Sequence, residues 1–98
     1  MLAVYKVHGN SMVPTLREGD YVVTRNVFKN CKPGNLVVAK HSVYGILIKR
    51  IFEVDNSGYL SLIGDNEEDS LSTESMGWFS PENIIASVMM RVPSPQTP

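Results

Sequence analysis

The chain has 98 residues, of which 43% are hydrophobic, and its formal net charge at neutral pH is −1. This length suits one domain with its own core, and the near-neutral charge offers no attraction for nucleic acid or an anionic membrane. A single cysteine, Cys31, excludes an intrachain disulfide and favours a reducing compartment. We therefore expect a cytoplasmic protein without an integral membrane segment, with peripheral membrane association left open.

Short apolar segments with a period of two follow one another along the chain, and turn residues bound each of them. They predict six strands, over residues 2–7, 21–25, 36–40, 44–54, 59–63 and 84–92. Pro33-Gly34 suits a type II turn, and Asn56-Ser57-Gly58 suits a hairpin connection. No long amphipathic helix is predicted, although residues 14–18 and 81–83 could each form one short helical turn.

These elements predict an all-β fold, in which mostly antiparallel sheets form a partly closed barrel. One domain is expected over residues 1–92. Residues 93–98 contain three prolines and little that could be buried, so we expect them to form a disordered tail.

Three segments carry polar residues that strand formation does not explain. The first, residues 9–20, places Ser11 in a turn, two residues after a glycine and three before a proline. The second is an apolar run, residues 46–52, that contains Lys49. The third begins at residues 64–66 and continues through Ser70 to residue 83.

The first two segments supply the parts of a nucleophilic site. A serine hydroxyl is a weak nucleophile until a base accepts its proton. A lysine can be that base only when neutral, and burial among apolar side chains lowers the pKa of a lysine. Strand alternation puts Lys49 on one face with Leu47 and Ile51, which would desolvate its amine. Ser11 and Lys49 are therefore predicted to form a Ser-Lys dyad.

Taken together and in order, the three segments resemble the conserved boxes of type I signal peptidases and of LexA-like peptidases. Ser11-Met12-x-Pro14-Thr15-Leu16-x-x-Gly19-Asp20 is similar to their serine box, Lys49-Arg50 to their Lys-Arg pair, and Gly64-Asp65-Asn66 with Ser70, Gly77 and Pro81 to their third box. The resemblance runs from Gly9 to about Ala86. The family fold is all-β, in agreement with the strand pattern.

The resemblance also implies roles for individual residues. Ser11 would be acylated and its backbone N–H would bind the oxyanion, while Lys49 would be the base and Ser70 would orient it. Arg50 and Asp65 would form a supporting ion pair. Gly9 stands where some relatives have a serine that donates to the oxyanion.

Two further features concern the substrate. Met12 is interpreted as a substrate-binding or membrane-facing side chain rather than as core. The family's third box usually continues with Asp-Ser-Arg, whereas this chain has Ser72-Thr73-Glu74. The compact, soluble form is most similar to small maturation peptidases, such as those that trim nickel superoxide dismutase precursors.

The sequence therefore predicts a serine endopeptidase that cleaves a protein precursor or leader after small residues, without metal or cofactor. One alternative is a self-cleaving regulatory domain like those of SOS repressors and mutagenesis proteins. The chain contains no Ala-Gly or Cys-Gly bond for such a reaction, and ten residues precede Ser11. Another alternative is a non-catalytic β module that serves dimerisation.

Single residues also have simpler interpretations. Lys49 could be a charged residue that protects an edge strand from aggregation. His8 or His41 could form a Ser-His-Asp triad with Asp20 or Asp65. Trp78-Phe79 is expected in the core.

Overall fold

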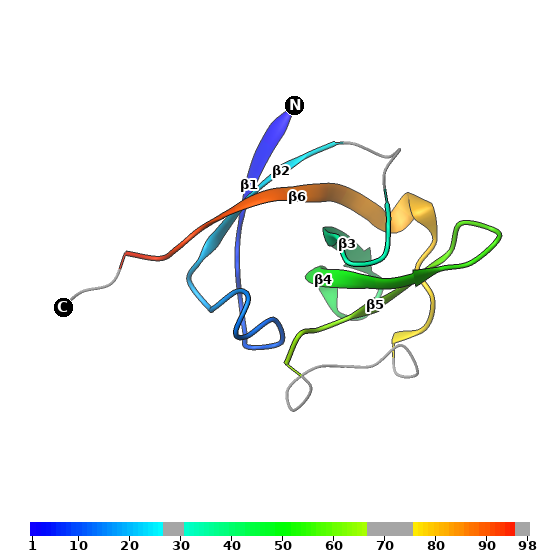
Figure 1. Ribbon diagram of the computed structural model, residues 1–98, viewed down its shortest axis with the longest axis horizontal. Coiled ribbons are helices and arrows are strands. Elements are labelled where there is room, and N and C mark those ends of the chain that lie inside the picture. Colours follow the sequence, from blue (N-terminus) through cyan, green and yellow to red (C-terminus); the bar gives the residue numbers. More distant parts are fainter. Residues whose placement is uncertain (27–30, 67–75, 96–98) are drawn as a thin grey trace.

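Six antiparallel strands make up almost all of the regular structure in the described part of the chain (Figure 1). The computed structural model describes residues 1–26, 31–66 and 76–95. The strands are β1 (Leu2–Lys6), β2 (Tyr21–Arg25), β3 (Leu36–His41), β4 (Gly45–Val54), β5 (Leu60–Ile63) and β6 (Ile84–Val92), with a 3₁₀ helix η1 (Pro81–Asn83) before β6. The all-β class is confirmed, and each predicted strand ends within one residue of the observed bounds.

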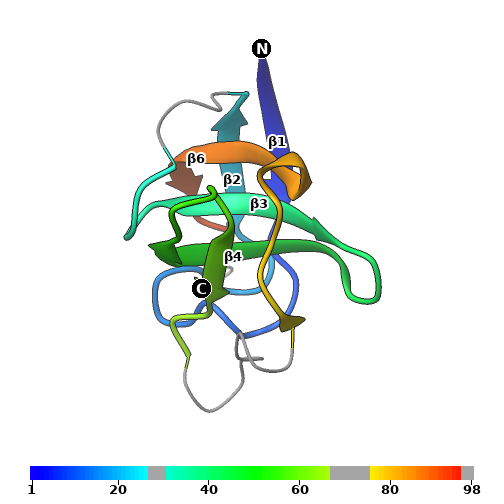
Figure 2. The same cartoon turned by 90° about the vertical axis from the view of Figure 1, so that its right-hand side faces the viewer.

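The strands form one open sheet in the order β1-β2-β6-β3-β4-β5. The predicted partial closure into a barrel is not observed, because β1 and β5 end the sheet among the described residues. The sheet is instead strongly curved, and Figure 2 shows β1 and β2 running across the direction of β3 and β4. Register shifts at Val23/Thr24 and Val38/Ala39, where β6 meets its two neighbours, account for this bend.

Both faces of the curved sheet bury apolar side chains. The Met12 cluster consists of buried Val7, Met12, Leu16 and Val22, with Ile48 packed against it. The Phe79 cluster lies around Val37, Ala39, Ile51, Leu60, Leu62, Met76, Phe79 and Ile84, with Leu47 packed against it. Successive residues of β4 thus reach different clusters, as the alternation of a strand requires. Phe79 is core as predicted, whereas Trp78 is exposed.

The predicted short helical turns have different outcomes. Residues 81–83 form η1, in which the Ser80 side chain caps the amide of Glu82. Residues 14–18 form no helix, although the Leu16 amide donates to the Met12 carbonyl at 2.9 Å in a single turn. No helix in the described part of the chain is long and apolar enough to cross a membrane.

A buried carboxylate ties the segment before β2 to the end of β6. Asp20 is 2% exposed and accepts from the backbone amides of Ser94 and Arg17, both at 2.9 Å, and from Arg91 Nε at 2.8 Å. The two amides, followed by the Arg91 guanidinium, hold the pKa of Asp20 below its usual value. Ser94 is therefore anchored, although it falls in the predicted disordered tail; residues 96–98 lie outside the described residues.

We predict that Asp20→Asn lowers the free energy of unfolding by about 1–3 kcal/mol at neutral pH, because it removes a charged acceptor from three donors. A carboxyl with a depressed folded pKa stabilises the fold above its unfolded pKa, and this contribution disappears as the pH falls through the folded pKa. Wild type should therefore lose stability below about pH 4 more steeply than the variant. Denaturant melts between pH 2 and 7 measure this, with exposed Glu53→Gln as control; parallel curves for wild type and Asp20→Asn would contradict the prediction.

Candidate functional site

Ser11 lies in the turn between β1 and β2, and backbone hydrogen bonds hold both ends of that segment together. The Val7 amide donates to the Asp20 carbonyl at 2.7 Å, and the Gly19 amide donates to the Val7 carbonyl at 2.9 Å. Gly9 has a φ of 78°, which strongly favours glycine. The conformation of the chain thus explains the glycine two residues before Ser11.

Met12 anchors this turn in the core. Its side chain is 2% exposed and belongs to the Met12 cluster, so Met12 is a core residue and the membrane-facing interpretation was wrong. Its role in substrate binding stays a prediction. Ser11, next to it, is half-buried. The turn therefore holds the serine at the surface through an apolar neighbour that points inward.

Lys49 is buried in β4, with 3% of its surface exposed. It pairs with Val37 of β3, and β4 lies between β3 and β5 in the sheet. A charged residue that protects a sheet edge would be exposed to solvent, so the burial of Lys49 contradicts the edge-strand interpretation. Alternation gives Lys49 the face of Leu47 and Ile51, as predicted, and both of these pack in the Phe79 cluster.

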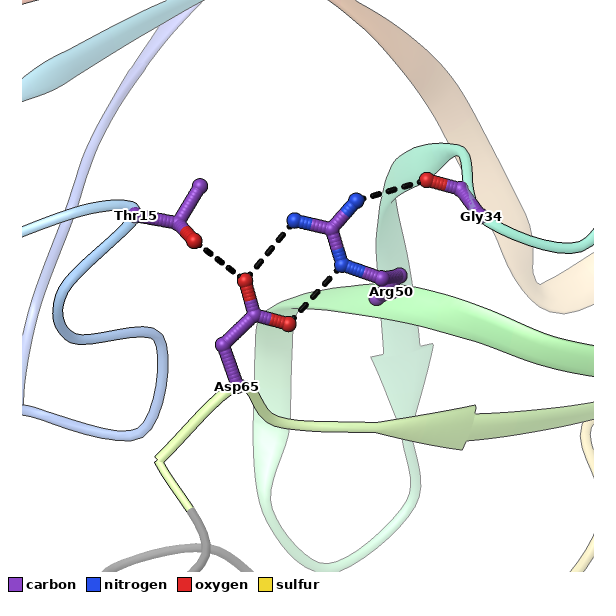
Figure 3. A network of polar contacts seen from close by, with 4 residues as sticks. All are labelled: Thr15, Gly34, Arg50 and Asp65. Atoms are coloured by element: carbon purple, nitrogen blue, oxygen red, sulfur yellow. Dashed lines mark hydrogen bonds and ion pairs between the residues drawn. The ribbon is translucent and has the colours of Figure 1, made fainter.

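An ion pair next to Lys49 connects four parts of the chain (Figure 3). Arg50 donates to both carboxylate oxygens of Asp65, at 2.8 and 2.7 Å, and to the Gly34 carbonyl at 2.7 Å. Thr15, in the serine turn, donates its hydroxyl to the same carboxylate. The Arg50 guanidinium, together with Thr15, holds the pKa of Asp65 below its usual value. The expected Arg50–Asp65 pair is present.

Asn66 fastens the third segment directly to the turn that carries Ser11. Its backbone amide donates to the Ser11 carbonyl at 2.9 Å, and its side-chain amide donates to the Asn10 carbonyl at 3.0 Å. The contacts of Thr15 and Asn66 were not foreseen from the sequence, although both residues stand inside the boxes singled out there. The first and third predicted segments thus meet in space, and Arg50 joins the second to them.

A cavity of about 290 Å³ opens beside Ser11. It is lined by residues 5–8, by Ser11 and Met12, and by residues 46–48 of β4. Apart from His8 in the triad alternative, the first of these stretches was not recognised in the sequence as part of a site, since it has the pattern of the end of an ordinary strand. The cavity gives the serine turn an adjoining space that a ligand could fill.

The histidine alternative disagrees with the contacts of its members. Asp20 and Asp65 each accept hydrogen bonds from an arginine and further donors. His41 Nδ1 accepts from the amides of Val43 and Tyr44, which leaves Nε2 as the donor to the Met76 carbonyl at 3.1 Å. Both ring nitrogens of His41 are therefore occupied by backbone groups.

Some of the predicted site residues lie in a segment that the structure does not describe. Ser70, expected to orient Lys49, lies outside the described residues, as does the Ser72-Thr73-Glu74 stretch. Across residues 1–26, 31–66 and 76–95, no cluster of three His, Cys, Asp or Glu side chains could hold a metal ion.

The chain was compared with protein-family models and with curated proteins. A family model described as Peptidase S24-like matches residues 1–79, a range that includes all three predicted segments up to Phe79. No curated protein matches the chain significantly.

Proposed function

Because this chain belongs to the Peptidase S24-like family, we propose that it is a serine endopeptidase with Ser11 as nucleophile and Lys49 as general base. The observation that supports this most is the burial of Lys49, which is 3% exposed on an inner strand. Burial of an amine that has no function only costs free energy. For a lysine that acts as a base the same burial is useful, because desolvation favours the neutral amine at physiological pH.

In the proposed reaction, neutral Lys49 accepts the hydroxyl proton as Ser11 Oγ attacks the scissile carbonyl. The resulting oxyanion receives a hydrogen bond from the Ser11 backbone N–H. The ammonium group then returns its proton to the leaving amine as the C–N bond breaks, which leaves an acyl-enzyme. Water, activated by the same amine, hydrolyses this ester and restores the serine. Ser70 is proposed to orient the amine.

Arg50 and Asp65 are proposed as positioning residues. Arg50 follows Lys49 in β4, and Asp65 binds Arg50 and Thr15, which lies four residues after Ser11. A carboxylate that binds both segments fixes the position of the nucleophile relative to the base. Small displacements of reacting groups lower the reaction rate strongly. The contacts of Asp65 with Arg50 and Thr15 should therefore affect kcat.

We predict that Asp65→Asn lowers kcat about 10- to 100-fold with little change in KM, because it loosens the turn relative to β4 without removing a reacting group. Asp20→Asn is the matched control. It also removes a carboxylate that binds an arginine, but this arginine is Arg91 of β6 and not Arg50. Steady-state kinetics well below both melting temperatures separate the two. An equal loss of kcat in both variants would show that general destabilisation, and not positioning, is responsible.

The proposed substrate is an extended segment of a protein precursor or leader. β5 pairs with β4 only from Arg50 onward, so among the described strands the edge of residues 45–48 that faces away from β3 has no paired strand. A peptide could add there as a strand beside Ser11. Cleavage after small residues, and kinship with the small peptidases that mature nickel superoxide dismutase precursors, are finer proposals that rest on the resemblance of the boxes. The single cysteine supports a cytoplasmic site of action.

A digest of a diverse library of unstructured peptides tests the proposal, with new termini read by mass spectrometry. Cleavage at recurrent positions, in proportion to added protein, is expected. A library that stays intact at every pH at which the protein is folded would favour the non-catalytic β module. Cleavage of the chain itself, with no cleavage of added peptides, would favour the self-cleaving regulatory domain.

A further inference from the structure

The cavity beside Ser11 is too large to be filled by the small residues expected at the scissile bond. Its volume is about 290 Å³. One water needs about 10–15 Å³ in a comparable measure, so the space holds on the order of twenty waters. An alanine methyl would leave almost all of this cavity volume filled with water. A second, larger side chain of the same peptide must therefore enter if the cavity is to be desolvated.

The floor of the cavity is apolar. Val7 and Met12 are buried members of the Met12 cluster, and Ile48 packs against that cluster. Leu47 lines the same space from β4. A branched or aromatic side chain would gain free energy by covering these groups, in proportion to the apolar area removed from water.

The rim of the cavity has a different character. Lys6 and His8 line it from the end of β1, and both are exposed. None of the described residues that line the cavity is acidic. The rim therefore presents one cation and one imidazole to an incoming peptide, with no carboxylate in the lining to neutralise them.

From this combination we propose that the cavity selects peptides that carry a large apolar side chain with an acidic residue next to it in the chain. The apolar side chain fills the floor, and the carboxylate meets Lys6 and His8 at the rim. This specificity rests on the proposed peptidase function, because it names the substrate of the same site. Lys6 and His8 act on peptide selection and take no part in bond cleavage.

The test measures peptide binding without turnover. Ser11→Ala protein labelled with ¹⁵N is titrated by NMR with end-capped hexapeptides of alanine and serine. One position carries Leu or Ala, and its neighbour carries Glu, Gln or Lys. We expect Leu peptides to bind about tenfold or more tightly than Ala peptides, from the buried methylenes. Glu should improve binding about two- to fivefold over Gln, as exposed charge pairs do, and Lys should weaken it.

Two variants assign the charge effect. In the Ser11→Ala background, Lys6→Ala should abolish most of the preference for Glu over Gln, and Lys6→Glu should reverse it in favour of Lys. Lys32→Ala, which removes an exposed lysine that does not line the cavity, should leave the preference unchanged. The preference should also weaken between 0.02 and 0.5 M salt, where screening shortens the Debye length from about 20 to about 4 Å.

Equal affinities for Glu, Gln and Lys peptides, or a preference untouched by Lys6→Ala, would overturn the proposal. Equal affinities for Leu and Ala peptides would overturn the part that concerns size. Because binding is measured on a variant without the proposed nucleophile, its outcome is independent of cleavage. If the preference is found but the wild type cleaves no peptide, the peptidase proposal is refuted and the binding site is retained. If the wild type cleaves peptides without the preference, the binding site is refuted and the peptidase proposal is retained.

Discussion

Replacement of Ser11 by alanine is expected to lower peptide cleavage about a thousandfold or more and to leave the fold intact. Removal of the nucleophile in a dyad leaves only binding and oxyanion stabilisation, which account for a small part of the rate. The fold should persist because the turn is held by backbone groups and by Met12, and the Ser11 carbonyl that accepts from Asn66 is kept.

Cleavage rates for a peptide found in the library digest, with thermal melts of both proteins, measure this prediction. Ser57→Ala is a suitable control, since Ser57 is an exposed serine in the β4–β5 turn. It should retain the wild-type rate. If Ser11→Ala cleaved the peptide at the wild-type rate as well, the nucleophile would have to be sought elsewhere.

Lys49→Arg and Lys49→Met are both expected to lack activity. Arginine keeps the positive charge, so a folded Lys49→Arg variant would stay active if only that charge were needed. If Lys49 is a general base, the folded variant is inactive, because the guanidinium stays protonated at every pH at which the protein is folded. Methionine retains the apolar stem at a buried position and should therefore fold, which separates lost chemistry from lost structure.

The pH dependence of wild-type activity provides an independent measurement. Activity should rise with pH on one limb, as the buried amine loses its proton, with a midpoint well below about 10.4, where exposed lysines titrate. His8→Ala and His41→Ala should keep the same limb. An active Lys49→Arg variant, or a limb that disappears with either histidine, would refute the proposed mechanism.

The strands were the most predictable part of this protein. Their alternation follows from half-buried positions on a sheet, a requirement that acts locally and leaves a direct trace in the sequence. The bend of the sheet depends on the register shifts at Val23/Thr24 and Val38/Ala39, which no local pattern specifies. Strand order has the same origin, since β6 pairs with strands far from it in sequence.

The candidate site was predictable to a different degree for different residues. Ser11 and Lys49 attract notice because a strand or a simple turn does not need them. Thr15 and Asn66 look like ordinary turn residues, and only the folded chain shows that they join the serine turn to Asp65 and its neighbours. Lys6 could not be singled out from the sequence, because an exposed lysine on a strand is common. Its position at the cavity rim depends on β4, which is distant in sequence.

The central place of β6 in the sheet has a consequence for biosynthesis. As the chain leaves the ribosome, β1 and β2 can pair first, and β3, β4 and β5 can pair next, each through connections between consecutive strands. The two halves are bridged in the sheet by β6, the last of the described strands to be made. Ser11 belongs to the first half and Lys49 to the second. A nascent chain that stops before β6 therefore has both residues but lacks the strand that joins the two halves of the sheet, so the proposed site is expected to form only after synthesis of β6.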